Sequence, residues 1–571
     1  MRFLLSEYIN LLKEDKELDT LLTDLLVGMK FTTISKPMKG RQFGVDISAI
    51  GIDPEDGIKK VFLFAVKQGN LTRTTWDGDV NAIRSTLNQI KDTFIPTSLT
   101  NRLKKHPKKI IVCTNGVINQ NVLVDWTQYI DQNTSDAVEY DFWGTGEITA
   151  MLDDYLVSEK LFPQEYQSLL RKSLAFLDLP DYDLSHFYTL IQKVLDKQPK
   201  QKRQILKKLR LVRLCLNIIY KWSQDNNNLK PSIYASERCL LLSWHFIQEG
   251  NHLDKNFVRQ EFYKIHSLKR NIGVFYFNKV AEHYKTEHSI YKYSRNSLEY
   301  SLNVWEEIGI IATIGLTEIQ EFRIHYREGN EEHAQTYYQS ALSISNGLCL
   351  FIKNNPPSKY PEYDVHSIEI ALALNLMNFT RNFNPAKKWI SEMTLGFNNR
   401  YKINKFFPLF RKNYDKLVDI HNGDEECEIQ SSMIVLLLAE YALVFRDEDL
   451  YQFVRKITTE LFTDLNLQIW FPLEEMENKI CIQDYSHGEG TLKHSVTLYE
   501  DVEDYKKEMI SEIELFGPEK DFKIFSHGFD IIAHVASRHY KSQPFPLTWR
   551  VLMKQELLTY PKNHIRITAR Y

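Results

Sequence analysis

Two stretches decide the fold of this chain: Gly40-Arg41-Gln42-Phe43-Gly44-Val45-Asp46-Ile47 and, further along, Phe62-Leu63-Phe64-Ala65-Val66-Lys67-Gln68-Gly69. The first is a glycine-containing turn that leads through Asp46 into an apolar run. The second is an apolar run that ends in a lysine. Because side chains two apart share one face of a strand, a strand over 61–67 places Leu63, Ala65 and Lys67 on one face and Phe62, Phe64 and Val66 on the other.

Lys67 is the only charged residue in the run 61–67, so a buried strand requires a partner for its ammonium group. Asp46 is the obvious partner. The intervening residues 51–57, Gly-Ile-Asp-Pro-Glu-Asp-Gly, are typical of a turn and predict a hairpin that brings Asp46 across from Lys67. A structural ion pair is the simpler interpretation of these two residues, since a Gly-x-Asp match alone is common.

Further motifs follow the same order as in a known family. An acid precedes a Leu-Leu pair in a helical segment, an aromatic residue comes before the Gly-x-Asp strand, a later strand ends in a T-N-G turn, and a closing strand leads into a helix. The matching residues are Leu18-Asp19-Thr20-Leu21-Leu22, Met29-Lys30-Phe31, Gly44-Val45-Asp46, 109–116, Tyr140-Asp141-Phe142-Trp143 and 148–156. Residues 1–155 thus resemble the restriction-endonuclease-like PD-(D/E)xK superfamily, and within it the Mrr-like branch.

The resemblance implies an α/β domain, with a central mixed sheet flanked by helices, that cleaves DNA with Mg²⁺ or Mn²⁺. It implies that Asp46 and the Val66 carbonyl hold the metal ion and that Asp19 matches the acid on the helix. Lys67 would orient the attacking water and offset charge on the scissile phosphate. The implied catalytic residues are Asp46, Lys67 and Asp19.

The chain departs from the family pattern at Ala65, where family members carry a Glu or Gln. One aspartate compensates little of the charge on a divalent ion, so we expect Asp19 to supply the second carboxylate. The alternative is a degenerate domain that retains the fold but has lost the metal: a nucleic-acid-binding adaptor without catalysis, joined to a helical scaffold for protein interaction.

Composition and length set the broader frame. A chain of 571 residues predicts more than one domain, since single cores seldom exceed ~250–300 residues. The formal charge of 71 minus 74, or −3, requires any nucleic-acid surface to be local. Six scattered cysteines show no zinc-ligand spacing, and no apolar run reaches the about eighteen residues of a membrane span. We therefore expect a cytoplasmic protein without a membrane segment, and no nucleotide-binding motif is present.

We expect three parts: a nuclease domain at 1–160, a basic helical connector at 161–230, and an α-helical, repeat-like domain at 231–571. In the last part apolar residues recur at helical spacing, and residues 329–342 resemble half of a tetratricopeptide repeat, with small Ala334 and Ala341. Separate helices are predicted at 297–308 and 318–327. We expect this domain to bind a protein partner or to self-associate.

The connector carries nine Lys or Arg residues between positions 193 and 213. On a helix, one basic stripe lies opposite an apolar stripe formed by Ile205, Leu209, Val212, Leu216 and Ile219. The basic stripe could grip the phosphates of double-stranded DNA, as could a second basic cluster that includes Lys108 and Lys109. The residues expected to bind nucleic acid are Gln42, Gln68, Lys104, Lys105, Arg203, Lys207 and Arg210. The resemblance to Mrr-like nucleases with long C-terminal extensions implies an endonuclease that acts in prokaryotic antiviral defence.

Overall fold

The computed structural model describes residues 18–35, 43–78, 82–155, 164–175, 181–471, 494–516 and 522–541, together with residues 6, 9, 10, 12, 14, 177, 477, 479–482, 490, 491, 549 and 550. The chain divides into two compact units, Met1–Pro231 and Ser232–Tyr571. Among the described residues, no helix is both long and apolar enough to cross a membrane.

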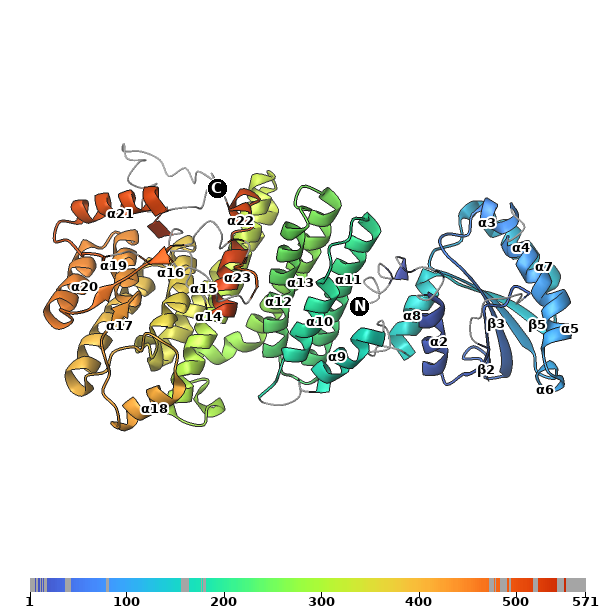
Figure 1. The fold of residues 1–571 in the computed structure, drawn as a ribbon, viewed down its shortest axis with the longest axis horizontal. Helices are drawn as coiled ribbons and strands as arrows, with labels where there is room; N and C mark the ends of the chain where they lie inside the picture. Colours follow the sequence, from blue (N-terminus) through green and yellow to red (C-terminus); the bar gives the residue numbers. More distant parts are fainter. Residues whose placement is uncertain are drawn as a thin grey trace. The chain divides into compact units, whose positions relative to one another are not determined.

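A five-stranded mixed sheet forms the centre of the first unit (Figure 1). Its strands lie in sequence order: β1 (Thr32–Ser35), β2 (Ile47–Ile52), β3 (Lys59–Lys67), β4 (Lys108–Thr114) and β5 (Val138–Trp143). Strand β2 is antiparallel to both β1 and β3, whereas β4 runs parallel to β3 and β5 runs parallel to β4. The predicted hairpin is thus the β2–β3 pair, and the predicted α/β class of the N-terminal part is confirmed.

Each face of the sheet is covered by helices, and the alternation along β3 decides which core each side chain enters. Leu63 and Ala65 join a core with residues of the helices that follow β3 and β4, among them Trp76 and Trp126. Phe62 and Phe64 face the opposite way, where Phe62 lies 4.7 Å from Phe31 and Phe64 lies 5.2 Å from Trp143, measured between ring centroids. The helices of this α/β part are α2 (Asp19–Gly28), α3 (Arg73–Asp77), α4 (Ile83–Gln89), η2 (Ile90–Phe94), α5 (Ile95–Ser98), α6 (Asn101–Lys104), α7 (Gln120–Asn133) and α8 (Thr145–Tyr155).

Three further helices complete the first unit: α9 (Gln164–Ala175), α10 (Ser185–Leu195) and α11 (Lys202–Asp225). The five residues of the predicted apolar stripe on α11 are all fully buried. The basic positions on the same helix, Arg203, Lys207 and Arg210, are half-buried.

The second unit is mostly helical, as predicted. Its longer helices are α12 (Lys230–Glu249), which begins at the end of the first unit, α13 (Asn256–Val280), α14 (Ser297–Arg327), α15 (Glu331–Asn354), α16 (Ser367–Phe379), α17 (Phe383–Asn404), α18 (Tyr414–Asn422), α19 (Ile434–Val444), α20 (Glu448–Leu461), α21 (Val502–Phe516) and α23 (Ile531–Tyr540). Short elements lie between them: η4 (Ala281–Lys285), η5 (Tyr291–Tyr293), η6 (Pro356–Lys359), η7 (Asp364–His366), α22 (Lys523–Ser526), and the strand pairs β6 (Ser431–Ser432) with β7 (Asn466–Leu467) and β8 (Trp470–Phe471) with β9 (Gly490–Thr491).

Helix α14 corrects the prediction of two separate helices at 297–308 and 318–327, because a single helix spans both segments. The glycines between them do not break it. A Cβ atom at Gly315 would lie 2.4 Å from a methyl carbon of Leu376 on α16, so glycine here allows two helices to pack closely. Tertiary packing thus outweighs the low helix propensity of glycine.

Buried ion pairs fasten α23 to this helical unit. The Nε atom of Arg538 donates to Oε1 of Glu237 on α12 at 3.0 Å, and both side chains are almost completely buried. One residue before α23, Asp530 pairs with Arg323 of α14 at 2.8 Å. The buried pair of Arg538 and Glu237 restricts the position of α23 most, because the loss of one partner from a buried ion pair destabilises the fold strongly.

Candidate functional site

The carboxyl ends of β3, β4 and β5 lie together, and the turns after them are in close contact. A Cβ atom at Gly116 would lie 2.5 Å from the carbonyl oxygen of Gly69, and one at Gly144 would lie 2.8 Å from the carbonyl oxygen of Gly116. Only glycine permits this approach of three backbone segments. Binding sites in parallel sheets form at this end of the strands, and Lys67 lies there.

Asp46 precedes β2 and is fixed to β3 by its backbone and its side chain. Its N–H donates to the Phe64 carbonyl oxygen at 2.8 Å, and its Oδ2 accepts from the Val66 N–H at 2.7 Å. The turn before it requires glycine, because Gly44 has a φ of +84° and a Cβ atom there would lie 2.7 Å from Thr86. The carboxylate predicted as a metal ligand is therefore hydrogen-bonded to the backbone N–H of Val66, the residue whose carbonyl is the second predicted ligand.

Burial raises the pKa of Asp46 above its ordinary value, although the hydrogen bond from Val66 and the charge of Lys67 lower it. The charges of Glu14 and Asp19 raise the pKa of Asp46 further. The charges of Lys67 and Asp19 thus act on the Asp46 carboxylate. Among the described residues, however, the ion pair of Lys67 is formed with Glu14 and not with the expected partner Asp46. A carboxylate with a raised pKa beside a lysine is typical of a functional site, though structural ion pairs produce the same signature.

Glu14 is the acid that the sequence did not reveal. Its Oε1 lies 3.5 Å from Nζ of Lys67, and its Oε2 accepts from the Gln68 N–H at 3.2 Å. No local motif marks Glu14, because it reaches Lys67 only through the fold. Ala65 is fully buried in the apolar core, so the usual position of the family's second acid carries no charge.

Asn115, from the T-N-G turn, holds the N-terminal segment that carries Glu14. Its Nδ2 donates to the Leu12 carbonyl oxygen at 2.7 Å, and its Oδ1 accepts from the Gly69 N–H at 2.6 Å. A second tie joins Thr145 to the side chain of Asn10 at 2.7 Å. The amide of Asn115 thus links the turn after β3 to the segment beside Lys67.

Arg203 of α11 reaches the same place. It donates to the Leu12 carbonyl oxygen at 2.8 Å, and its two terminal nitrogens lie 2.7 Å from the side-chain oxygen of Gln68 in the amide orientation that satisfies both groups. Two of the residues expected to bind nucleic acid, Gln68 and Arg203, therefore meet beside Lys67. Gln42 lies outside the described residues, and Lys207 and Arg210 lie further along α11.

The second basic cluster differs from expectation. Lys104 and Lys105 are exposed, but Lys108 and Lys109 are buried at the start of β4. Lys109 lies 2.5 Å from Glu55, 3.2 Å from Asp53 and 3.3 Å from Asp141. The four lysines were expected to form a basic surface, but two of them, Lys108 and Lys109, are buried. Lys109 points toward acids of β5 and of the β2–β3 turn.

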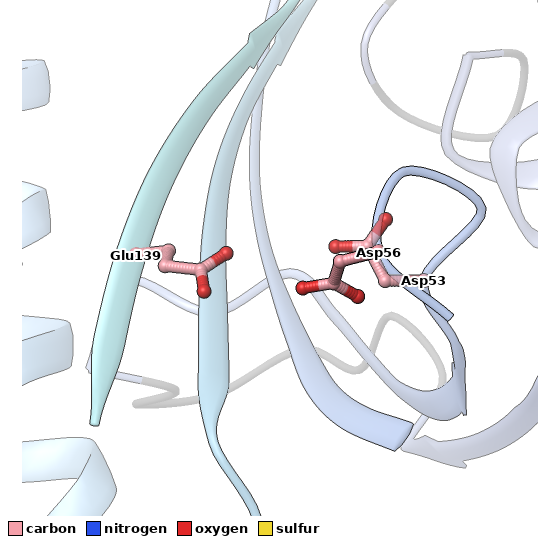
Figure 2. A group of neighbouring side chains, drawn as sticks. All are labelled: Asp53, Asp56 and Glu139. Carbon is pink, nitrogen blue, oxygen red and sulfur yellow. The ribbon is translucent and has the colours of Figure 1, made fainter. Parts of the chain in front are cut away.

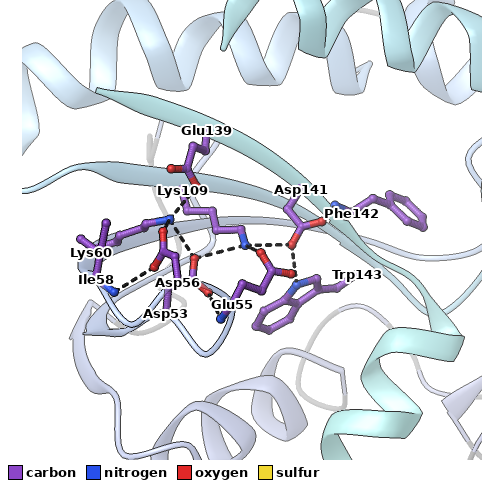
Figure 3. Close-up of polar contacts among 10 residues, drawn as sticks. All are labelled: Asp53, Glu55, Asp56, Ile58, Lys60, Lys109, Glu139, Asp141, Phe142 and Trp143. Carbon is purple, nitrogen blue, oxygen red and sulfur yellow. Dashed lines mark hydrogen bonds and ion pairs between the residues drawn. The ribbon is translucent and has the colours of Figure 1, made fainter. Parts of the chain in front are cut away.

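Lys60, near the start of β3, is the centre of an acidic group that the sequence did not indicate (Figure 3). Figure 2 shows the acids Asp53, Asp56 and Glu139 of this group. Carboxylate oxygens of Asp53, Asp56 and Glu139 all lie within 4.8 Å of one another, so these residues could hold a metal ion. However, Nζ of Lys60 lies 3.0 Å from Asp53 and 2.7 Å from Glu139 and also contacts Asp56. The lysine already places a positive charge among these carboxylates.

The pKa of Asp53 reflects this arrangement. Burial pushes the pKa upward, but the Glu55 N–H and the ammonium groups of Lys60 and Lys109 outweigh that effect and hold it below its ordinary value. The group lies at the amino ends of the parallel strands, away from Lys67. We interpret it as an ion network that fixes the β2–β3 turn to β4 and β5.

The donor atoms near Asp46 fit a magnesium ion in type, since Mg²⁺ binds carboxylates, carbonyls and water. They are not closed into a tight ligand set: within the described part of the chain, Asp53, Asp56 and Glu139 form the only such group of three.

No protein-family model matches the chain, and neither a curated protein nor a solved structure matches it. The resemblance to PD-(D/E)xK nucleases thus remains a hypothesis that depends on the residues quoted above. The α/β fold and the positions of Asp46 just before β2 and of Lys67 at the end of β3 are consistent with this hypothesis.

Proposed function

We propose that the first unit is a metal-dependent endonuclease that hydrolyses phosphodiester bonds of double-stranded DNA. One observation carries the proposal: a desolvated aspartate, Asp46, accepts a hydrogen bond from the backbone N–H of Val66, the residue before Lys67. The charge of Asp19 raises the pKa of this aspartate. An acid and an ammonium group at the carboxyl ends of parallel strands suit an anionic substrate that is attacked by water.

In this proposal each residue has a distinct task. Asp46 and the Val66 carbonyl would hold Mg²⁺ or Mn²⁺, with Asp19 as the second acid. A bound ion would supply Lewis-acid activation of the phosphate and a more acidic water. The ammonium group of Lys67, about one-third exposed, would bind a phosphate oxygen and orient the water.

The positions of basic residues support the proposed DNA substrate. Arg203 and Gln68 beside Lys67 would contact phosphates that flank the cleaved bond, and the exposed Lys104 and Lys105 would extend that contact. The helical second unit would bind an activating protein or a second copy of this chain. An effector of prokaryotic antiviral defence is the biological setting that we propose for such a protein.

A plasmid-cleavage assay with Mg²⁺ or Mn²⁺ tests the proposal. Cleavage by the full chain should be lost in Asp46→Ala and in Lys67→Ala. Two matched variants on the same domain, Asp131→Ala on α7 and Lys59→Ala, alter exposed residues of the same types and should cleave normally. Equal cleavage by all four variants would exclude Asp46 and Lys67 from the chemistry.

A nucleic-acid-binding adaptor without catalysis is the second candidate. The burial of Ala65 in the apolar core favours it, because the position of the usual second acid cannot ligate an ion. DNA binding by the native chain without cleavage in either metal would support the adaptor. The variant Asp19→Ala distinguishes the two candidate functions further. It should abolish DNA cleavage if the domain is a nuclease, and it should leave DNA binding unchanged if the domain is an adaptor.

A further inference from the structure

Glu14 engages the two groups on β3 that are best placed to bind a phosphate. One carboxylate oxygen faces the Lys67 ammonium group and the other accepts from the Gln68 N–H. A phosphate presents two oxygens to a cation and an adjacent N–H in the same way, because both anions are multivalent acceptors. The Glu14 carboxylate therefore occupies the position that a substrate phosphate would need.

The contact is suited to displacement. Glu14 is 42 % exposed and Lys67 is 35 % exposed, and the atoms of the pair lie 3.5 Å apart. Exposed ion pairs with this geometry contribute little to stability. A polyanion that brings several phosphates at once would compete effectively with a single carboxylate.

The backbone at Leu12, two residues before Glu14, makes shorter contacts than the Glu14 side chain does. The Leu12 carbonyl oxygen accepts from Asn115 at 2.7 Å and from Arg203 at 2.8 Å. Arg203 also lies against the side chain of Gln68. One arginine on α11 therefore contacts both the N-terminal segment and the residue after Lys67.

We propose that Leu12, Glu14 and Arg203 form an autoinhibitory clasp, in which Glu14 mimics a phosphate at Lys67 and Arg203 keeps it there. This proposal rests on the proposed function, because it names the regulation of the same site. Displacement of Arg203, by movement of α11 or by DNA that draws its guanidinium group to a phosphate, releases Glu14 and frees Lys67.

The reactivity of the Lys67 amine tests the clasp without reference to cleavage. Full-length chains are treated briefly with an acetylating reagent, and the rate at Lys67 is read by mass spectrometry relative to the exposed Lys59. Glu14→Gln and Arg203→Gln should each raise the Lys67 rate about two- to fivefold, the range expected for release of an exposed ion pair. The matched controls alter exposed residues of the same types, Asp131→Asn on α7 and Lys221→Gln on α11, and should leave the rate unchanged.

Plasmid cleavage by the same variants separates the two proposals. Faster cleavage in Glu14→Gln together with faster labelling supports both the clasp and the nuclease. Faster labelling without cleavage in any variant supports the clasp and overturns the nuclease. Unchanged labelling in Glu14→Gln overturns the clasp whatever the cleavage result, and loss of cleavage in Glu14→Gln also overturns it, because Glu14 would then belong to the catalytic acids.

Discussion

Replacement of Lys60 by methionine should destabilise the sheet of the first unit strongly. Methionine fills the volume of the lysine stem but leaves three carboxylates without the ammonium group that they share. Loss of one partner from a buried ion pair costs about 3–5 kcal/mol. The lower value, about 3 kcal/mol, applies here, because Asp56 and Glu139 are 36 and 38 % exposed and can regain water, and because Lys109 still contacts Asp53.

Amide hydrogen exchange, read by mass spectrometry on peptides from β2 to β5, measures this cost locally in the full chain. A loss of about 3 kcal/mol speeds exchange by about a hundredfold, since each 1.4 kcal/mol is a factor of ten. Lys59→Met, one residue earlier and exposed, is the matched control and should exchange at the native rate. The double variant Asp53→Asn with Lys60→Met should recover part of the loss, because it removes a buried charge together with its partner.

The effect should also depend on pH with a defined sign. The folded-state pKa of Asp53 lies below its ordinary value of 3.8, so its contribution to stability is present above that value and disappears as the pH falls through the lowered pKa. The difference between native and Lys60→Met chains should therefore shrink in acid. Equal exchange in Lys60→Met and Lys59→Met at neutral pH would refute the ion network as a source of stability.

Three further outcomes are expected. Asp46→Asn should raise the thermal unfolding midpoint at pH 7, because burial disfavours the charged form of Asp46 in the folded state. This gain should vanish as the pH falls below 3.8, where the acid is protonated in both the folded and the unfolded state. An unchanged or lower midpoint at pH 7 would contradict this expectation. Gly116→Ala should lower the free energy of unfolding by about 1–3 kcal/mol in urea, whereas Gly146→Ala, with open space around its Cβ position, should not destabilise. Arg538→Met should lower the stability of the second unit by about 3–5 kcal/mol, and the additional change Glu237→Gln should restore part of this loss. Hydrogen exchange of α12 and α23 measures both effects. Additive losses in the double variant would argue against a coupled pair.

The sequence predicted those parts of the fold that depend on local periodicity. The alternation along 61–67 assigned Leu63 and Ala65 to one core and Phe62 and Phe64 to the other, and the turn residues at 51–57 predicted the hairpin. These features require only that neighbouring side chains and turn residues follow simple steric rules.

The long-range polar contacts could not be predicted in the same way. Glu139 of β5 reaches Lys60 of β3 across the intervening strand β4, and Glu14 reaches Lys67 from a segment far away in the chain, so neither pair leaves a local pattern. Lys109 was expected at the surface because most lysines are exposed. Only the sheet register, which pairs Lys109 with Phe62 and with Glu139, turns it toward Asp53.

Two lysines near opposite ends of strand β3, Lys60 and Lys67, have different surroundings. Lys60 is almost completely covered and surrounded by acids, while Lys67, about 23 Å away at roughly 3.3 Å per residue, is open to water and meets one displaceable acid. A saturation screen of this strand should consequently separate two phenotypes: variants at Lys60 would fail to accumulate in cells, and variants at Lys67 would accumulate normally yet lose the DNA cleavage that we propose.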